Sequence, residues 1–428
     1  MMTDITDKQN KALNFLDSRL NAKLLTHLNS CVHCGLCGTS CQYYITEKNS
    51  KNMPASKVDI VASIYRRYHT FAGKHFPKLT GARDLNDQTT EEMIDDLFGR
   101  CTMCGRCVAH CSIGVDIPFV VRTGRMMLQQ MDLVPKSIQS TVDAALNTGN
   151  NMAIPTQDFV DTINWLNEDL QFEVNDDEAT IPLNVHGVKM LYTLNPREPK
   201  FFPLSISAIA KVFYLAKESW TISTEFYDIT NYAYFVGDEE GARVITERLI
   251  NEALKFGADT LILGECGHGS RAMRWEGPNW MKAKYPVKTI TAVELIANYI
   301  REGRIKPDKS KITDRVTIHD PCNLVRNGGI IDEQRYIVNQ CCSDFVEMTP
   351  HGVDNFCCGG GGGQLAMSEY NDRRMRIGKI KADQIRATGA KIVVTPCHNC
   401  VDQLSSLNVE YNLGVTIKTI AEIVADAL

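Results

Sequence analysis

The chain has 428 residues, of which 44% are hydrophobic and 23% are charged, and its formal net charge is -5. This composition allows ordinary folded cores and excludes a disordered chain, while the length suggests two or three domains. No basic block favours nucleic acid as a partner, and the most apolar stretch, residues 201–216, is interrupted by polar side chains. The polar N-terminus lacks the apolar core of a secretory signal. We therefore expect a cytoplasmic protein that does not itself span a membrane.

Two segments near the N-terminus repeat the spacing C-x2-C-x2-C-x3-C, from Cys31 to Cys41 and from Cys101 to Cys111. Clustered cysteines in a reducing cytoplasm indicate metal or redox chemistry, not disulfides. In such runs three thiolates bind one cubane 4Fe-4S cluster, and the fourth commonly binds the other cluster. A structural zinc site is the alternative, but it needs only four sulfurs, usually from two knuckles across a longer gap. The predicted ligands are Cys31, Cys34, Cys37 and Cys111 for one cluster, and Cys41, Cys101, Cys104 and Cys107 for the other.

This N-terminal module departs from the small bacterial ferredoxin pattern. Gln42 and Ser112 stand where proline usually follows the fourth cysteine, and residues 42–100 separate the two runs. Apolar residues at helical spacing in that insertion, at 58–64 and 93–98, predict helices. The module resembles the α-helical ferredoxin domain of succinate dehydrogenase iron–sulfur subunits and of the heterodisulfide reductase C subunit. We assign residues 1–135 to this domain.

The remainder of the chain predicts an α/β fold. After a helix expected at 119–131, residues 136–184 form a linker or helical connection. Strands predicted at 188–193 and 260–263 flank a helix predicted at 241–256, an alternation that implies parallel βαβ units. Similar segments recur further along, 257–266 with 389–397 and 287–290 with 417–420. We expect two copies of one unit, at 185–308 and 309–428, although short βα segments also resemble one another by chance.

The C-terminal copy contains a second cysteine pattern, made of His319-Asp-Pro-Cys322, Cys357-Cys358-Gly-Gly and Cys397-His-Asn-Cys400. It resembles the cysteine-rich (CCG) domain of the heterodisulfide reductase B and D subunits. The resemblance implies that five cysteines hold a non-cubane 4Fe-4S cluster. Those cysteines are Cys322, Cys357, Cys358, Cys397 and Cys400.

Position and composition agree with such a site. Cys322 and Cys397 each follow a predicted strand, at the carboxyl edge where α/β sheets bind ligands. Gly359 and Gly360 begin a run of five glycines that lets backbone approach a cluster. A flexible loop is the alternative for this run. A phosphate-binding loop is excluded because no Gly-Lys-Ser/Thr follows.

The N-terminal copy keeps only Cys266 of the five cysteines, within Gly264-Glu-Cys-Gly-His268. One thiol cannot hold a cluster, so we expect two cubane clusters and one non-cubane cluster. The whole chain resembles the heterodisulfide reductase D-like subunits of the Dsr, Tmc and Hmc membrane redox complexes of sulfate reducers. This resemblance implies anaerobic respiration, sulfate reduction, and other redox subunits as partners, including a haem b membrane subunit. It also implies a peripheral position on the inner face of the cytoplasmic membrane.

Three functions remain open on these grounds. The first is an oxidoreductase subunit that reduces a disulfide or oxidises thiols of a small molecule or protein, with Cys266 and His268 as candidate catalytic residues. The second is a pure electron conduit. The third is a CCG-type subunit of a flavin-dependent glycerol-3-phosphate, glycolate or lactate dehydrogenase, whose flavin sits on a partner because no dinucleotide fingerprint occurs. Cys341 and Cys342 are expected to be ordinary core residues.

Overall fold

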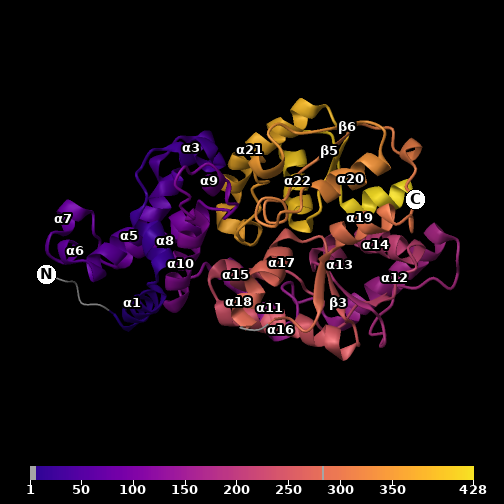
Figure 1. Cartoon of the computed structure of the whole chain (residues 1–428), viewed down its shortest axis with the longest axis horizontal. Coiled ribbons are helices and arrows are strands. Elements are labelled where there is room, and N and C mark those ends of the chain that lie inside the picture. Colours follow the sequence, from indigo (N-terminus) through magenta and orange to yellow (C-terminus); the bar gives the residue numbers. More distant parts are fainter. Residues whose placement is uncertain (1–5, 282–283) are drawn as a thin grey trace. The chain divides into compact units, whose positions relative to one another are not determined.

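The computed structural model describes residues 6–281 and 284–428, which form two compact units (Figure 1). The helical unit contains the chain up to residue 139 together with 233–238 and 359–380. The sheet unit contains 140–232, 239–358 and 381–428. Each unit is therefore built from segments that lie far apart in the sequence.

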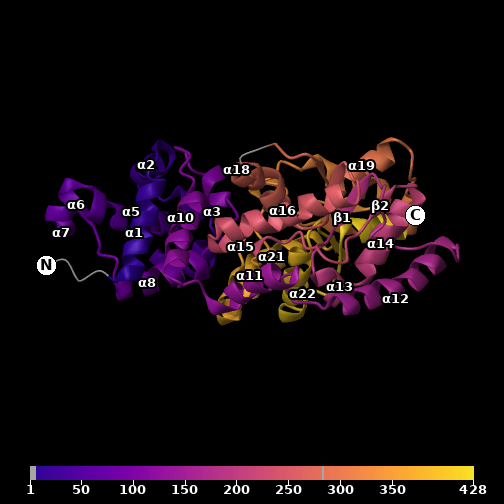
Figure 2. The same cartoon turned by 90° about the horizontal axis from the view of Figure 1, so that it is seen from below.

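The helical unit is organised around α10 (Ile117–Gln130), which packs against α1, α2 and α5; Figure 2 shows these helices side by side. Asp116 caps α10 by accepting a hydrogen bond from the amide of Phe119, and Pro118 suits the first turn because its missing N–H has no helical partner there. The other helices are α1 (Asp7–Arg19), α2 (Ala22–Asn29), α3 (Leu36–Ser40), α4 (Gln42–Glu47), α5 (Pro54–His69), α6 (Phe71–His75), α7 (Pro77–Thr80), α8 (Asp87–Ile94) and α9 (Arg106–Ala109).

A buried guanidinium fastens the distant segments to this unit. Arg125 on α10 is fully buried, and its guanidinium donates hydrogen bonds to the carbonyls of Leu97, Cys101, Phe235 and Gly362. Four carbonyl acceptors offset the cost of burying this cation. This arrangement explains why residues 233–238 and 359–380 belong to the helical unit, whereas the predicted domains follow sequence order.

The sheet unit contains two parallel four-stranded sheets with matching strand order. The first runs β2-β1-β3-β4 and the second runs β6-β5-β7-β8. A duplicated βα unit would produce this correspondence. The strands are β1 (Met190–Thr193), β2 (Trp220–Thr221), β3 (Thr260–Leu263), β4 (Lys288–Thr291), β5 (Val316–Ile318), β6 (Phe345–Val346), β7 (Ile392–Val394) and β8 (Thr416–Lys418).

The helix after the last strand of each sheet begins in the same way. Thr291 and Glu294 form a capping box at α19, and Thr419 and Glu422 form one at α23. Reciprocal hydrogen bonds of this type satisfy amides that a helix start leaves without partners. The main helices of the unit are α12 (Thr156–Val174), α13 (Arg197–Phe201), α14 (Leu204–Leu215), α16 (Glu239–Lys255), α17 (Gly267–Arg271), α18 (Gly277–Met281), α19 (Ala292–Arg301), α20 (Asp332–Cys341), α22 (His398–Glu410) and α23 (Ile420–Ala427).

Three further helices cross the boundaries between the units: α11 (Lys136–Thr148), α15 (Tyr232–Val236) and α21 (Asn371–Thr388). The segment expected as a linker or helical connection, 136–184, holds all of α11 and all of α12. Phe159, Ile163 and Leu166 of α12 are buried in the core of the sheet unit.

One hydrophobic core joins the two sheets. Tyr192 and Ile262 of the first sheet share this core with Ile318 and Val394 of the second. Alternate residues of the first sheet, such as Leu261, face a separate cluster on its other side. Burial on both faces fits the nearly continuous apolar character of β3, an inner strand of the first sheet.

Candidate metal centres

The two cysteine motifs of the helical unit have matching backbone conformations. His33 and Met103 both have φ near +50°, at 54° and 53°, and Gly35 and Gly105 both have positive φ, at 82° and 78°. Left-handed residues on both sides of the second cysteine bend each loop tightly. Successive sulfurs can then face a common centre, which fits the binding of a compact cluster.

The first group of thiols combines the beginning of one motif with the end of the other. The pKa of Cys37 is raised, mainly by burial and further by the neighbouring thiols of Cys31, Cys34 and Cys111. Cys34 is exposed, whereas the other three are partly buried. Four thiols close enough to affect one another match the ligand set predicted for the first cluster.

The second group combines the last cysteine of the first motif with the first three cysteines of the second motif. The pKa of Cys41 is raised to about 12, mainly by burial, with further contributions from the thiols of Cys104 and Cys101. Burial also raises the pKa of Cys107, with further contributions from the thiols of Cys104, Cys101 and Cys41 and, last, from Cys37 of the first group. The amide of Met103 donates to Cys101 Sγ at 3.4 Å, an interaction that stabilises a cluster-bound thiolate. The sulfur-only donor set fits an iron–sulfur cluster.

The two groups differ in the charges that surround them. Lys57 is buried, its Nζ donates to the carbonyl of Met53 at 3.2 Å, and its charge acts on Cys41 and Cys101 of the second group. At the first group the nearby charge is an anion, because Asp59 raises the pKa of Cys31 in addition to the effect of burial.

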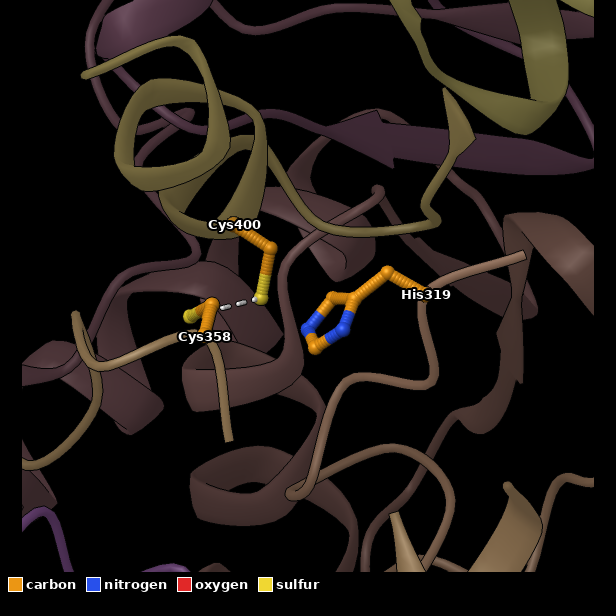
Figure 3. A group of neighbouring side chains, drawn as sticks. All are labelled: His319, Cys358 and Cys400. Carbon is orange, nitrogen blue, oxygen red and sulfur yellow. Dashed lines mark hydrogen bonds between the residues drawn. The ribbon is translucent and has the colours of Figure 1, made fainter. Parts of the chain in front are cut away.

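The third site lies at the carboxyl edge of the second sheet. Cys322 follows β5, while Cys397 and Cys400 stand at the start of α22 after β7. Cys357 and Cys358 lie in the loop after β6. All five predicted ligands are buried. Among them, the Sγ atoms of Cys358 and Cys400 lie 3.5 Å apart, as expected for two sulfurs on one metal ion (Figure 3).

Two residues that sequence reasoning missed lie at this site. A ring nitrogen of His319 and the sulfurs of Cys358 and Cys400 lie within 4.8 Å of one another (Figure 3). Burial, and then the charge of Lys381, lower the pKa of His319 well below its usual value. Lys381 is itself buried near Cys357, Cys358 and Cys400, and burial lowers its pKa to about 8. The histidine stands in the His-Asp-Pro-Cys run; nothing in the sequence marks Lys381.

The first sheet contributes directly to the surroundings of the third site. The amide of Gly267 donates to Cys397 Sγ at 3.4 Å. The pKa of Cys397 is lowered to about 7, first by the hydrogen bond from Cys400 and also by the amides of Gly267, Cys400 and Asn399, against the effect of burial. The carboxyl edges of the two sheets therefore meet at this cysteine.

Cys266 lies at this meeting point, at the start of α17. Its Sγ is surrounded by the amide of Gly269 at 3.5 Å, the side-chain amide of Asn195 at 3.6 Å and the hydroxyl of Thr230 at 3.7 Å. The thiol is buried, and burial, followed by the neighbouring Cys397, raises its pKa to about 12. It is therefore protonated at neutral pH.

His268, the second candidate catalytic residue, is also buried. Its Nδ1 accepts a hydrogen bond from the side-chain amide of Asn399 at 2.6 Å, and its ring meets that of Tyr232 edge to face. Burial lowers its pKa to about 4, and the Cys357 thiol acts in the opposite direction. His268 is thus a neutral imidazole close to one of the predicted ligands.

The glycine run begins directly after the cysteine pair. Gly359 has a φ of +107°, and Gly362 has a φ of +63°. A Cβ at Gly362 would lie 2.7 Å from the carbonyl of Thr102, so this position requires glycine. The segment that leaves Cys358 thus reaches, within the helical unit, the loop of the second cysteine motif. Cluster binding by Gly359 and Gly360 remains a prediction.

Within residues 6–281 and 284–428, no helix has both the length and the apolar character required to cross a membrane.

Two protein families match separate parts of the chain. Residues 27–115 match the 4Fe-4S dicluster domain, and residues 316–405 match the cysteine-rich domain. These matches confirm the predicted fold class, in which a helical domain with 4Fe-4S motifs precedes an α/β cysteine-rich domain. Iron–sulfur clusters are therefore the cofactors of this chain.

Curated relatives extend over most of the chain. The Hdr-like menaquinol oxidoreductase iron-sulfur subunit 2 of Archaeoglobus fulgidus is 28% identical over 88% of this chain and 75% of the relative. The D subunit of the dihydromethanophenazine:CoB--CoM heterodisulfide reductase of Methanosarcina mazei is 26% identical over 96% of both chains. The EtfAB:quinone oxidoreductase of Syntrophomonas wolfei is 24% identical over 90% of this chain and 55% of the relative.

Proposed function

We propose that this chain, a relative of heterodisulfide-reductase-like iron–sulfur subunits, transfers electrons within a membrane-associated redox complex. The cysteines of the helical unit would hold two cubane clusters, and those at the sheet edge would hold a non-cubane 4Fe-4S cluster; bound there, the clusters would allow electrons to pass to or from a site of thiol/disulfide chemistry. The observations that support this proposal are the two groups of neighbouring thiols in the helical unit and the set of buried cysteines at the sheet edge. When bound, such clusters supply one-electron steps at potentials set by nearby charges, hydrogen bonds and solvent.

The proposed reaction converts one disulfide into two thiols with two electrons and two protons. Cys266 Sγ attacks one substrate sulfur, the S–S bond breaks, and the leaving sulfur takes the proton that Cys266 gives up. Two electrons from the reduced partner subunit and two protons then release the second thiol and restore the Cys266 thiol. His268 would position the substrate, because its neutral ring lies near Cys357.

A redox partner would dock at the first cubane site. Apolar side chains stand exposed within its loops: Val32 is 68% exposed, Leu36 47% and Ile113 49%. Val32 and Leu36 flank the exposed Cys34 in the sequence, and Ile113 lies two residues after Cys111, another predicted ligand of the same cluster. Exposed apolar groups around a redox centre typify a protein contact surface. We propose that a membrane subunit, carrying haem b, covers this loop surface.

A pure electron conduit is the second candidate, and burial of the third site favours it. The most exposed of the five cysteines, Cys322, is only 8% exposed, and Cys266 is 1% exposed. A disulfide substrate would need an opening movement before it could reach these sulfurs, whereas electrons need none.

Purification of the native complex under anaerobic conditions tests the proposal. We expect about twelve iron atoms per chain, four in each of three clusters, together with a haem-containing membrane subunit. Reduced methyl viologen should drive reduction of bis(2-hydroxyethyl) disulfide. If all three clusters were present but no disulfide were reduced, the result would favour the pure electron conduit. Co-purification of a flavoprotein would instead favour the subunit of a flavin-dependent dehydrogenase.

A further inference from the structure

His319 has a fixed position beside the third site. It directly follows β5, and its backbone amide donates to the carbonyl of Val394 on β7 at 2.8 Å. The side chain is fully buried, and Figure 3 shows its ring turned towards the sulfurs of Cys358 and Cys400. The sheet itself therefore holds this imidazole against two predicted ligands.

The ring of His319 lacks the hydrogen bonds that a buried imidazole normally makes. Within the described part of the chain, neither Nδ1 nor Nε2 has a hydrogen-bond partner. The neighbouring buried His398 differs, because Nδ1 lies 3.2 Å from the Glu265 carbonyl and Nε2 lies 3.0 Å from Ser205 Oγ. Buried polar atoms without partners are costly and rare in folded proteins. The ring of His319 is therefore suited to a ligand absent from the polypeptide.

The surrounding distances suit a metal ligand. The two sulfurs lie 3.5 Å apart, and a ring nitrogen lies within 4.8 Å of both. Ligands on one tetrahedral ion lie roughly 3.4–3.8 Å apart, given metal–sulfur distances of about 2.3 Å and metal–nitrogen distances of about 2.0–2.1 Å. A small movement on metal binding would bring all three atoms to such distances, and a neutral imidazole offers the required lone pair.

We infer that His319 is a sixth protein ligand at the third site, bound through a ring nitrogen to the iron that Cys358 and Cys400 hold. This inference rests on the proposed function, since it requires a cluster at that site.

Nitrogen hyperfine spectroscopy of the full chain provides the test. Protein made with 15N-labelled histidine should show, in the EPR-active state of the third cluster, a strongly coupled histidine nitrogen whose signal changes with the isotope. This measurement needs no substitution, so it does not depend on the folding of a variant. His319→Gln should lose the coupling, whereas His398→Gln, which changes another buried histidine of the same unit, should retain it.

The possible results separate this inference from the function on which it rests. About twelve irons per chain without a strongly coupled histidine nitrogen would overturn the ligand role of His319 and leave the cluster assignment intact. Retention of the coupling in His319→Gln would assign it to another histidine and also overturn the inference. About eight irons per chain, with no signal from a third cluster, would overturn both.

Discussion

The guanidinium of Arg106 donates a hydrogen bond to the backbone carbonyl of Ser40 at 2.6 Å. Arg106 stands between Cys104 and Cys107, and Ser40 immediately precedes Cys41. This hydrogen bond joins the two cysteine motifs at the place where the first motif would supply Cys41 as a ligand of the second cluster. It therefore supports the crossed assignment, in which Cys41 serves the cluster of Cys101, Cys104 and Cys107.

The crossed assignment predicts which substitutions act on the same cluster. Cys41→Ala should remove the same EPR signal as Cys104→Ala, although the two residues belong to different motifs. Cys111→Ala should instead match Cys34→Ala. Iron analysis and EPR of the four purified variants provide the measurement. If Cys41→Ala and Cys34→Ala affected the same signal, each motif would hold its own cluster.

The buried charge of Lys57 should raise the reduction potential of the second cluster. Lys57→Met should lower that potential by tens of millivolts, because any two unit charges about 10 Å apart interact by on the order of 2 kcal/mol at an effective dielectric constant of about 20. The first cluster should shift much less. An EPR-monitored redox titration measures both potentials.

Lys78→Met is the matched control, because this exposed lysine of α7 carries the same charge in the same unit. Equal shifts in the two variants would show that net charge, and not the position of Lys57, sets the potential.

The local pattern of apolar and polar residues predicted the secondary structure well for strands and helices whose buried faces give a clear periodicity. The strand predicted at 260–263 coincides with β3, and the helix predicted at 241–256 differs from α16 (Glu239–Lys255) by two residues or fewer at each end. The helix expected at 119–131 begins earlier, at Ile117, because Asp116 caps it and Pro118 fits its first turn.

Features that depend on long-range contacts could not be predicted. The assignment of residues 359–380 to the helical unit depends on the hydrogen bond from Arg125 to Gly362 and on the close approach of Gly362 to Thr102. No local signal marks these contacts. The sequence around Lys381 likewise predicts only a lysine on a polar helix. Its burial beside the cysteine thiols results from tertiary packing, which local sequence does not indicate.

The proposed docking surface predicts that a charge at its centre weakens assembly. Val32→Glu should reduce electron exchange with the membrane subunit at least tenfold, because the complex would have to bury an unpaired carboxylate. Both cubane clusters should remain. Co-purification and stopped-flow reduction by the partner measure the effect.

Val409→Glu is the control, since Val409 is 78% exposed on α22 of the sheet unit. Normal assembly of Val32→Glu, or equal loss with Val409→Glu, would contradict docking at the loops of the first cubane site.

The proposed attack by Cys266 predicts a defined pH dependence. Its pKa is raised to about 12, so the thiolate is the minor form at neutral pH and increases about tenfold for each pH unit. Turnover of bis(2-hydroxyethyl) disulfide should therefore rise steeply between pH 7 and about 9 if thiol attack limits the rate.

Cys266→Ser should abolish turnover while all three cluster signals persist. Cys341→Ser is a closely matched control, because Cys341 is equally buried and its pKa is also raised to about 12. Unchanged turnover in Cys266→Ser would leave the third site acting without this thiol.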